Sequence, residues 1–317
     1  MIDLSSNESP YGRSCEELMD LCRGLEDLNR YLAYGELERL ERELAEYCGV
    51  DKERIFVGSG TDNLIRNALL KFYKGMDLIV LNPCGNRVVE TAKDLGMRIR
   101  RIQLRPPEFR VDWKSLEIKK SIVAIDYPNN PTGQLLIEKN ELECLLKNGN
   151  IVIIDEAGYE YSKRTFAGMV GAYEKLAVTR TLDKAFGLAG LRVGYMVAGD
   201  FFVKVIGKTV DINRPAFVCA MEALRDERHM RESVSKTLEE REYLEYRLRE
   251  LGFDVYKSQA NYLCVRSEIA DLALRLREKG ILVEDLSREW FDGYFRISIG
   301  GRDENSRLLE EIELMCG

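Results

Sequence analysis

The stretch TRTLDKAFGLAGLRVGY, residues 179–195, combines the end of an apolar strand, one lysine and a glycine-rich turn. Lys184 follows the apolar run 175–179, and an amine desolvated at a strand end has a lowered pKa and can act as a Schiff-base nucleophile. Arg192 and Thr181, on either side of it, could bind one phosphate through a guanidinium and a hydroxyl. On these residues alone, a surface lysine and an arginine at the edge of the core are the simpler explanation. The rest of the chain favours the chemical one.

The composition is that of an ordinary globular protein, with 317 residues of which 45% are hydrophobic and 32% are charged. This length allows one large domain and a smaller one. A net charge of −7 gives no reason to expect a nucleic-acid partner, and no apolar run has the length of a membrane span. No signal peptide is recognisable, so we predict a cytoplasmic protein whose eight cysteines are reduced. The single histidine, His229, speaks against histidine triads and histidine-rich metal sites.

Short apolar runs alternate with amphipathic helices over the first two thirds of the chain. Strands are predicted at residues 54–57, 78–81, 98–104, 121–126, 151–155, 175–179 and 193–198. Helices are predicted at residues 36–47, 63–72, 88–95 and 138–147. This alternation is typical of an α/β domain with a largely parallel, buried sheet.

The pattern changes after about residue 199. Residues 216–251 are predicted to be mostly one long helical region, and shorter strands and helices follow it. We therefore predict three parts: an N-terminal arm, 1–34, with a short helix at about 15–25 that packs with the small domain; a large α/β domain, 35–215; and a small α+β domain, 216–317.

Polar residues gather where predicted strands end, which is where open α/β sheets bind ligands. The turn 58–62, GSGTD, opens a helix, so its amides suit a phosphate, although it is not a dinucleotide fingerprint. Asn130 follows the strand IVAID and could hold a phenolic oxygen. Asp155 ends the very hydrophobic strand IVIID, and a carboxylate buried there needs a cationic partner such as a protonated pyridine nitrogen.

Four segments in order carry a family resemblance. NNPTG at 129–133, IIDEA at 153–157 and TLDKAFGLAGLRVGY at 181–195 resemble the fold-type-I aminotransferases of class I/II, which use pyridoxal 5'-phosphate. LSSNESPYG at 4–12 and FRISIGGRDENSRLLEEIE at 295–313 are most similar to the histidinol-phosphate aminotransferases. The resemblance covers nearly the whole chain. It implies a large domain with a mostly parallel sheet between helices, a smaller α+β domain, and amino-group transfer between a phosphorylated amine or amino acid and 2-oxoglutarate.

The resemblance also implies a role for each matching residue. Lys184 would form the internal aldimine and shuttle a proton, and Asp155 would keep the pyridine nitrogen protonated so that the ring is an electron sink. The other residues would hold the cofactor or the substrate. They are Asn130 at the 3-oxygen; Thr181, Arg192 and the amides of Gly60, Thr61 and Asp62 at the phosphate; Arg296 at the substrate's anionic group; and Tyr31 or Tyr34, reaching across the interface of a homodimer. The Arg30-Tyr31 pair matches the family better, whereas simple packing of the arm explains either tyrosine nearly as well.

Three positions depart from the family pattern at the cofactor. Gly85 stands where a stacking ring is usual, Gly158 where a tyrosine follows Asp-Glu-Ala, and Asp183 where a hydroxyl precedes the lysine. A lost stacking ring or hydrogen bond costs about 1 kcal/mol each. A carboxylate ~4 Å from the phosphate would cost about 4 kcal/mol at an effective dielectric near 20. Asp183 must therefore turn away, for example toward Arg192, or the phosphate is held less tightly.

These departures leave two alternatives to transamination. The related threonine-phosphate decarboxylases lack the tyrosine that Gly158 replaces, so decarboxylation of a phosphorylated amino acid is a rival reaction. A degenerate, non-catalytic homologue is the other alternative, because Gly85, Gly158 and Asp183 all fall at one site. Joint retention of Lys184 and Asp155 favours an enzyme.

Overall fold

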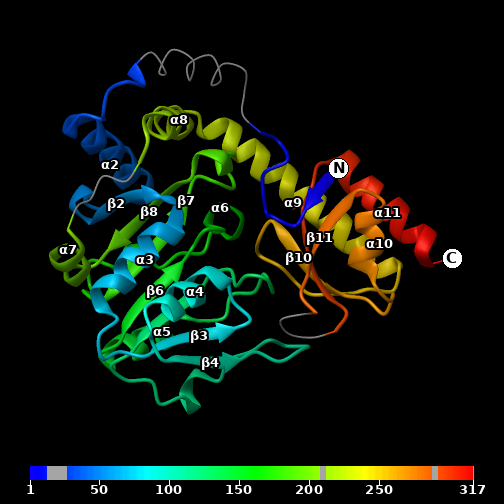
Figure 1. The fold of residues 1–317 in the computed structure, drawn as a ribbon, viewed down its shortest axis with the longest axis horizontal. Helices are drawn as coiled ribbons and strands as arrows, with labels where there is room; N and C mark the ends of the chain where they lie inside the picture. Colours follow the sequence, from blue (N-terminus) through cyan, green and yellow to red (C-terminus); the bar gives the residue numbers. More distant parts are fainter. Residues whose placement is uncertain (13–26, 208–211, 288–291, 317) are drawn as a thin grey trace.

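The computed structural model describes residues 1–12, 27–207, 212–287 and 292–316. Two sheets organise these residues, each with its own helices (Figure 1). Both termini lie beside the smaller sheet, so the first residues of the chain come back to the part built by the last hundred.

The larger sheet has seven strands and confirms the predicted α/β class. Its order is β2 (Ile55–Ser59), β8 (Val193–Ala198), β7 (Leu176–Thr181), β6 (Ile151–Asp155), β5 (Ile122–Asp126), β3 (Leu78–Asn82) and β4 (Ile99–Gln103). Strand β8 runs antiparallel to both neighbours, and the other pairings are parallel. Most of its strand residues are buried because helices cover both faces.

Alternating side chains of the strands feed two cores. Helices α2 (Tyr34–Cys48), α5 (Lys139–Lys147) and α8 (Arg214–Arg225) pack on one face, where they meet Val152 and Ile154 of β6. Helices α3 (Gly60–Phe72), α4 (Asn86–Asp94) and α7 (Asp200–Ile206) pack on the other, against Ile151 and Ile153. Asp155, the next residue on that second face, therefore lies at the end of a strand whose apolar neighbours fix its direction.

The smaller sheet has the order β1 (Ile2–Leu4), β11 (Ile281–Asp285), β12 (Tyr294–Ser298), β10 (Tyr262–Arg266) and β9 (Asp254–Val255). Helices α9 (Glu227–Glu250), α10 (Leu272–Glu278) and α11 (Arg302–Cys316) bury apolar residues in its core. Strand β1 pairs parallel with β11, with Ile2 opposite Ile281. The N-terminal arm thus supplies an edge strand that the sequence did not predict.

Some predicted boundaries differ from the structure. The helical region 216–251 is two helices separated at Asp226, whose carboxylate accepts a hydrogen bond from the amide of His229 at 3.2 Å and begins α9. Helix α3 begins at Gly60, within the predicted turn. The helix predicted at 15–25 lies outside the described residues.

The three-part division stays a prediction, and α8 buries its apolar residues in the core of the larger sheet. Within the described ranges, no helix is both long and apolar enough to cross a membrane.

Candidate active site

One cavity of about 610 Å³ opens at the carboxyl ends of β5, β6 and β7, and residues of the smaller sheet also line it. The structure brings most of the predicted site residues together there. Those that line the cavity are Thr61, Asp62, Asn130, Asp155, Thr181, Lys184, Arg192 and Arg296. They come from both sheets and from loops far apart in the sequence, so the site exists only in the folded chain.

Asp155 is held at the end of β6 by two hydrogen bonds to one carboxylate oxygen. The hydroxyl of Thr179 donates to Oδ1 at 3.0 Å, and the amide of Ala157 donates to the same atom at 3.2 Å. Burial, followed by repulsion from Asp126, raises the pKa of the Asp155 carboxyl to about 7. A cation placed against this carboxylate would relieve both unfavourable effects.

Asp126 is a second carboxylate in the cavity that the sequence analysis missed. It ends β5 in register with Asp155, and its Oδ2 accepts a hydrogen bond from the amide of Gly85 at 2.6 Å. A Cβ atom at Gly85 would lie 3.4 Å from that oxygen. The place where the family usually has a ring is therefore next to an enclosed carboxyl, whose pKa is raised by burial.

Lys184 lies just beyond β7 and lines the same cavity as Asp155. Burial lowers the pKa of its amine, whereas the charge of Asp155 raises it and the charge of Arg296 lowers it. The net result is a lysine that loses its proton more easily than a solvated one. Such an amine is a competent nucleophile toward an aldehyde.

Arg192 also lines the cavity and has a left-handed backbone conformation, with φ of 58°. Its Nη2 donates to Oδ2 of Asp62 at 3.0 Å, and its Nη1 contacts Oδ2 of Asp183. A Cβ atom at Gly60 would lie 2.7 Å from Nη2, so a side chain there would make the guanidinium shift, and the φ of Gly60, 80°, also favours glycine. Asp183 thus turns toward Arg192, the first of the two outcomes that the sequence allowed.

Thr181 and Arg87 line the cavity as well. The hydroxyl of Thr181 donates to the carbonyl of Val193 at 2.9 Å and accepts from the amide of Asp183 at 3.0 Å. Arg87, whose side chain is exposed, places Nη1 3.0 Å from Oδ2 of Asp62. The sequence analysis did not identify Arg87, because nothing in its local pattern links it to the loop at Asp62.

Arg296 approaches from β12 of the smaller sheet. Its Nη1 donates to Oδ1 of Asn130 at 2.7 Å, its Nη2 contacts the carbonyl of Ser5, and its buried Nε has no hydrogen-bond partner among the described residues. The amide oxygen of Asn130 faces Arg296, and its Nδ2 has no hydrogen-bond partner among the described residues, so this donor could serve another group. The ring of Tyr262 lies 5.7 Å from the guanidinium carbon, and its hydroxyl donates to the carbonyl of Asn129 at 2.9 Å.

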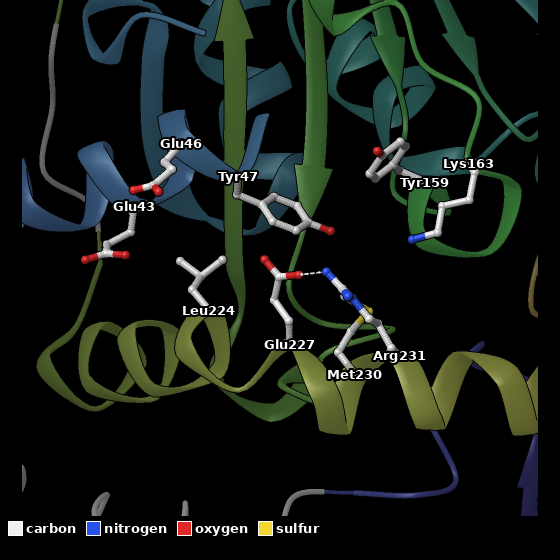
Figure 2. A pocket seen from close by; sticks show the side chains of 9 residues that line it. All are labelled: Glu43, Glu46, Tyr47, Tyr159, Lys163, Leu224, Glu227, Met230 and Arg231. Carbon is white, nitrogen blue, oxygen red and sulfur yellow. Dashed lines mark hydrogen bonds and ion pairs between the residues drawn. The ribbon is translucent and has the colours of Figure 1, made fainter. Parts of the chain in front are cut away.

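Tyr159 does not replace the tyrosine that is missing at Gly158. Gly158 lines the main cavity, whereas Tyr159 lines a second cavity of about 410 Å³ between α2, α6 (Tyr159–Ser162) and α9 (Figure 2). The guanidinium of Arg180 lies 3.5 Å from the centre of its ring, and the amine of Lys163 lies 5.6 Å from it. These cations hold the ring on the other face of the sheet.

Tyr31 lies outside the cavity. Its side chain is 99% exposed, while its backbone carbonyl accepts a hydrogen bond from Nη2 of Arg214 at 3.0 Å. The side chain of Tyr34 is not among those that the structure describes. The single chain therefore leaves the predicted contact of either tyrosine with a cofactor untested.

Comparison with known proteins decides the family. The family model "Aminotransferase class I and II" matches residues 1–312. The chain belongs to this family. It is 33% identical to a histidinol-phosphate aminotransferase of Pyrococcus furiosus, with 99% of this chain and 94% of the relative covered. It is 32% identical to another from Sulfurisphaera tokodaii, with coverage of 98% and 88%.

Solved structures confirm the fold of this aminotransferase. The histidinol-phosphate aminotransferase of Clostridium acetobutylicum superposes with a TM-score of 0.89 at 23% identity, covering 100% of this chain and 99% of that one. The enzyme of Sinorhizobium meliloti, solved in complex with pyridoxal 5'-phosphate, superposes with a TM-score of 0.85 at 20% identity, covering 99% and 90%. These superpositions confirm the predicted fold type I. Membership of the family and the relatives above 30% identity confirm the predicted class, an aminotransferase dependent on pyridoxal phosphate.

The cavity fits this cofactor in its chemistry. It is lined by Arg192, which lies beside a glycine with no side chain, by a lysine whose amine is easily deprotonated, and by an enclosed carboxylate, Asp155. These are the partners that a phosphate, an aldehyde and a protonated ring nitrogen require.

The pKa of Asp155 predicts how the stability of the cofactor-free protein depends on pH. An aspartate has a pKa near 3.9 when unfolded, and the folded value is about 7. Between about pH 4 and pH 7 the Asp155 carboxyl is ionised in the unfolded state but still protonated in the folded state. The free energy of unfolding therefore falls as pH rises over this range and stays constant above it. Asp155→Asn keeps an oxygen for Thr179 and Ala157. It should raise the free energy of unfolding by about 2–4 kcal/mol near pH 8 and leave it unchanged near pH 4.

Urea unfolding of the cofactor-free protein at several pH values measures this effect. The matched control is Asp94→Asn, which removes an exposed carboxylate from α4 and should change the profile little. A cofactor-free Asp155→Asn protein that is no more stable than the parent near pH 8 would contradict the prediction.

Proposed function

We propose that the cavity binds pyridoxal phosphate with Lys184 at its aldehyde and Asp155 at its ring nitrogen. Asn130, whose Nδ2 has no hydrogen-bond partner among the described residues, would donate from that atom to the 3-oxygen. The cofactor supplies an electron sink that lowers the barrier to breaking bonds at the substrate's α-carbon. The observation that carries this proposal is a lysine of lowered pKa in one cavity with an enclosed carboxylate of raised pKa.

Other residues at this cavity suit the phosphate group of the cofactor. We propose that Arg192, the hydroxyl of Thr181 and the amides of Gly60, Thr61 and Asp62 hold the cofactor's phosphate. Helix α3 begins at Gly60, so its first amides are free donors at the positive end of a helix dipole. The Nε of Arg296 has no hydrogen-bond partner among the described residues, which supports a role of this guanidinium in binding the anionic group of the substrate.

In the proposed reaction, Lys184 would take the proton from the donor's α-carbon and so act as the general base. The donor class we propose is a phosphorylated amine or amino acid, and the relatives named above make histidinol phosphate the first candidate. The acceptor would be a 2-oxo acid such as 2-oxoglutarate. Arg296 is the observation that favours an anionic donor, because a buried guanidinium with an unpartnered Nε favours binding of an anion.

A half-reaction screen tests the proposal. The cofactor-loaded protein is mixed with single amino donors, without any oxo acid, and the absorbance change from the lysine-bound to the amine form of the cofactor is followed. We expect conversion with histidinol phosphate, and return of the first spectrum when 2-oxoglutarate is added. A protein that binds the cofactor and converts with no donor would contradict amino transfer.

Gly158 keeps one rival reaction open to test. It leaves the cavity without the tyrosine that the family usually has there, and Tyr159 is held elsewhere. Release of carbon dioxide from threonine phosphate, with no oxo acid present, would indicate decarboxylation in place of amino transfer.

We also propose that the protein is a cytoplasmic homodimer in which Tyr31 reaches the cofactor phosphate of the neighbouring subunit. The fully exposed ring and the anchored backbone of Tyr31 support this, because a large exposed aromatic side chain on a fixed backbone suits an interface. Analytical ultracentrifugation of the parent protein measures the state. A monomer that carries full activity would contradict the arrangement.

A further inference from the structure

A carboxylate stands directly beside the arginine that we assign to the substrate. Glu284 of β11 and Arg296 of β12 are cross-strand partners, and Oε2 of Glu284 lies 4.0 Å from Nη2 of Arg296. Both line the main cavity. The side chain of Glu284 is 47% exposed and that of Arg296 is 12% exposed, so the carboxylate is much more accessible than the guanidinium beside it.

Other carboxylates add to the negative charge of this part of the cavity. Glu8 of the N-terminal arm lines the same space, and Asp126 lies deeper, at the end of β5. The cations Arg87 and Arg192 are each within 3.0 Å of Asp62. Among the cavity-lining residues that the structure describes, two cations remain, Lys184 and Arg296, and only Arg296 is assigned to the substrate's anionic group.

This charge distribution limits the kind of donor that the cavity suits. An anionic group that pairs with Arg296 comes close to Glu284, and the like charges repel each other. A donor that also carries a positive charge would place it against Glu284 and turn this repulsion into attraction. Electrostatic complementarity of this kind gives specificity more than raw affinity.

We propose that Glu284 is a specificity-determining residue that selects amino donors with a cationic nitrogen close to the anionic group bound by Arg296. Basic α-amino acids belong to this class, and so do amino phosphates with an imidazole, whose unperturbed pKa is about 6.5. This inference rests on the proposed function. It adds that the preferred donor carries a positive charge as well as the anionic group.

The test compares two donors that differ mainly in one charge. Ornithine ends in an ammonium, and norvaline has the same three side-chain carbons without it. In half-reactions of the cofactor-loaded enzyme, we expect the parent to prefer ornithine over norvaline by about three- to five-fold in kcat/KM, the upper part of the range for one partly exposed ion pair. Glu284→Gln should remove this preference and leave the norvaline value within about two-fold, since only the charge is lost.

Two further variants make the experiment decisive. Asp285→Asn removes the next carboxylate of the same strand, which lies outside the cavity and accepts a hydrogen bond from the amide of Ser287, and it should keep the preference. Glu284→Arg replaces the carboxylate by a cation and should favour a donor with an anionic side chain instead. We expect it to raise kcat/KM for O-phosphoserine at least about five-fold over the parent. An unchanged ornithine preference in Glu284→Gln, with half-reactions running normally, overturns the role of Glu284 alone. Absence of every half-reaction in the parent overturns the proposed function on which this inference rests.

Discussion

Replacing Lys184 by alanine is expected to lower the rate of amino transfer by at least about 10,000-fold. The same change should remove the absorbance band of the lysine-bound cofactor. The reason is that one amine has two tasks, as the nucleophile toward the aldehyde and as the group that moves the proton at the donor's α-carbon. No other lysine lines the cavity among the described residues, so no neighbour can take over either task.

Two control variants separate this chemistry from simple loss of charge. Lys184→Arg keeps a cation near Asp155 but offers no nucleophilic amine at neutral pH, so it should be as inactive as the alanine variant. Lys163→Ala removes a lysine from the second cavity, where its amine lies against Tyr159, and should keep both the absorbance and the rate. A Lys184→Ala enzyme within about ten-fold of the parent rate would contradict the assignment.

Local patterns predicted the part of the site that lies on the strands. Asp155 was predicted because it follows four apolar residues that turned out to be buried. The end of such an apolar run marks the end of a buried strand, whichever strands it pairs with. Asp126 ends a strand of the same kind, IVAID, and its register with Asp155 makes them neighbours. That carboxylate could have been found from the sequence by applying the same rule to the preceding strand.

The residues that sequence reasoning could not place depend on contacts between distant segments. Tyr159 is one residue from the expected position of a tyrosine, but Arg180, from another strand, holds its ring on the other face of the sheet. Glu284 reaches the cavity through the pairing of β11 with β12, which no local periodicity specifies. Strand β1 has three residues, too few for an alternating pattern to be recognised.

Replacing Asp183 by serine is expected to tighten cofactor binding by about 100-fold. Asp183 is 6% exposed, its Oδ1 accepts a hydrogen bond from the amide of Val193 at 2.9 Å, and its Oδ2 contacts Arg192. A phosphate that binds Arg192 must share this guanidinium with the carboxylate. Full Coulomb repulsion at ~4 Å would amount to about 4 kcal/mol at an effective dielectric near 20.

The expected gain in the free energy of cofactor binding is smaller than the full Coulomb repulsion for two reasons. Arg192 is 42% exposed, so solvent screens part of the repulsion. Burial also raises the pKa of the Asp183 carboxyl, although Arg192 opposes this, so a bound phosphate can drive it to take up a proton. About two thirds of that repulsion, roughly 2.7 kcal/mol, corresponds to the 100-fold change.

Titration of the cofactor-free protein with pyridoxal phosphate, followed by absorbance, measures this affinity. Asp183→Asn keeps an oxygen for the amide of Val193 and removes only the charge, so it should tighten binding as serine does. Asp183→Glu keeps the charge and should give no gain. If serine and asparagine both weaken binding, Asp183 must instead orient Arg192 toward the phosphate. The aspartate would then be a positioning residue whose pairing with Arg192 outweighs its repulsion of the anion.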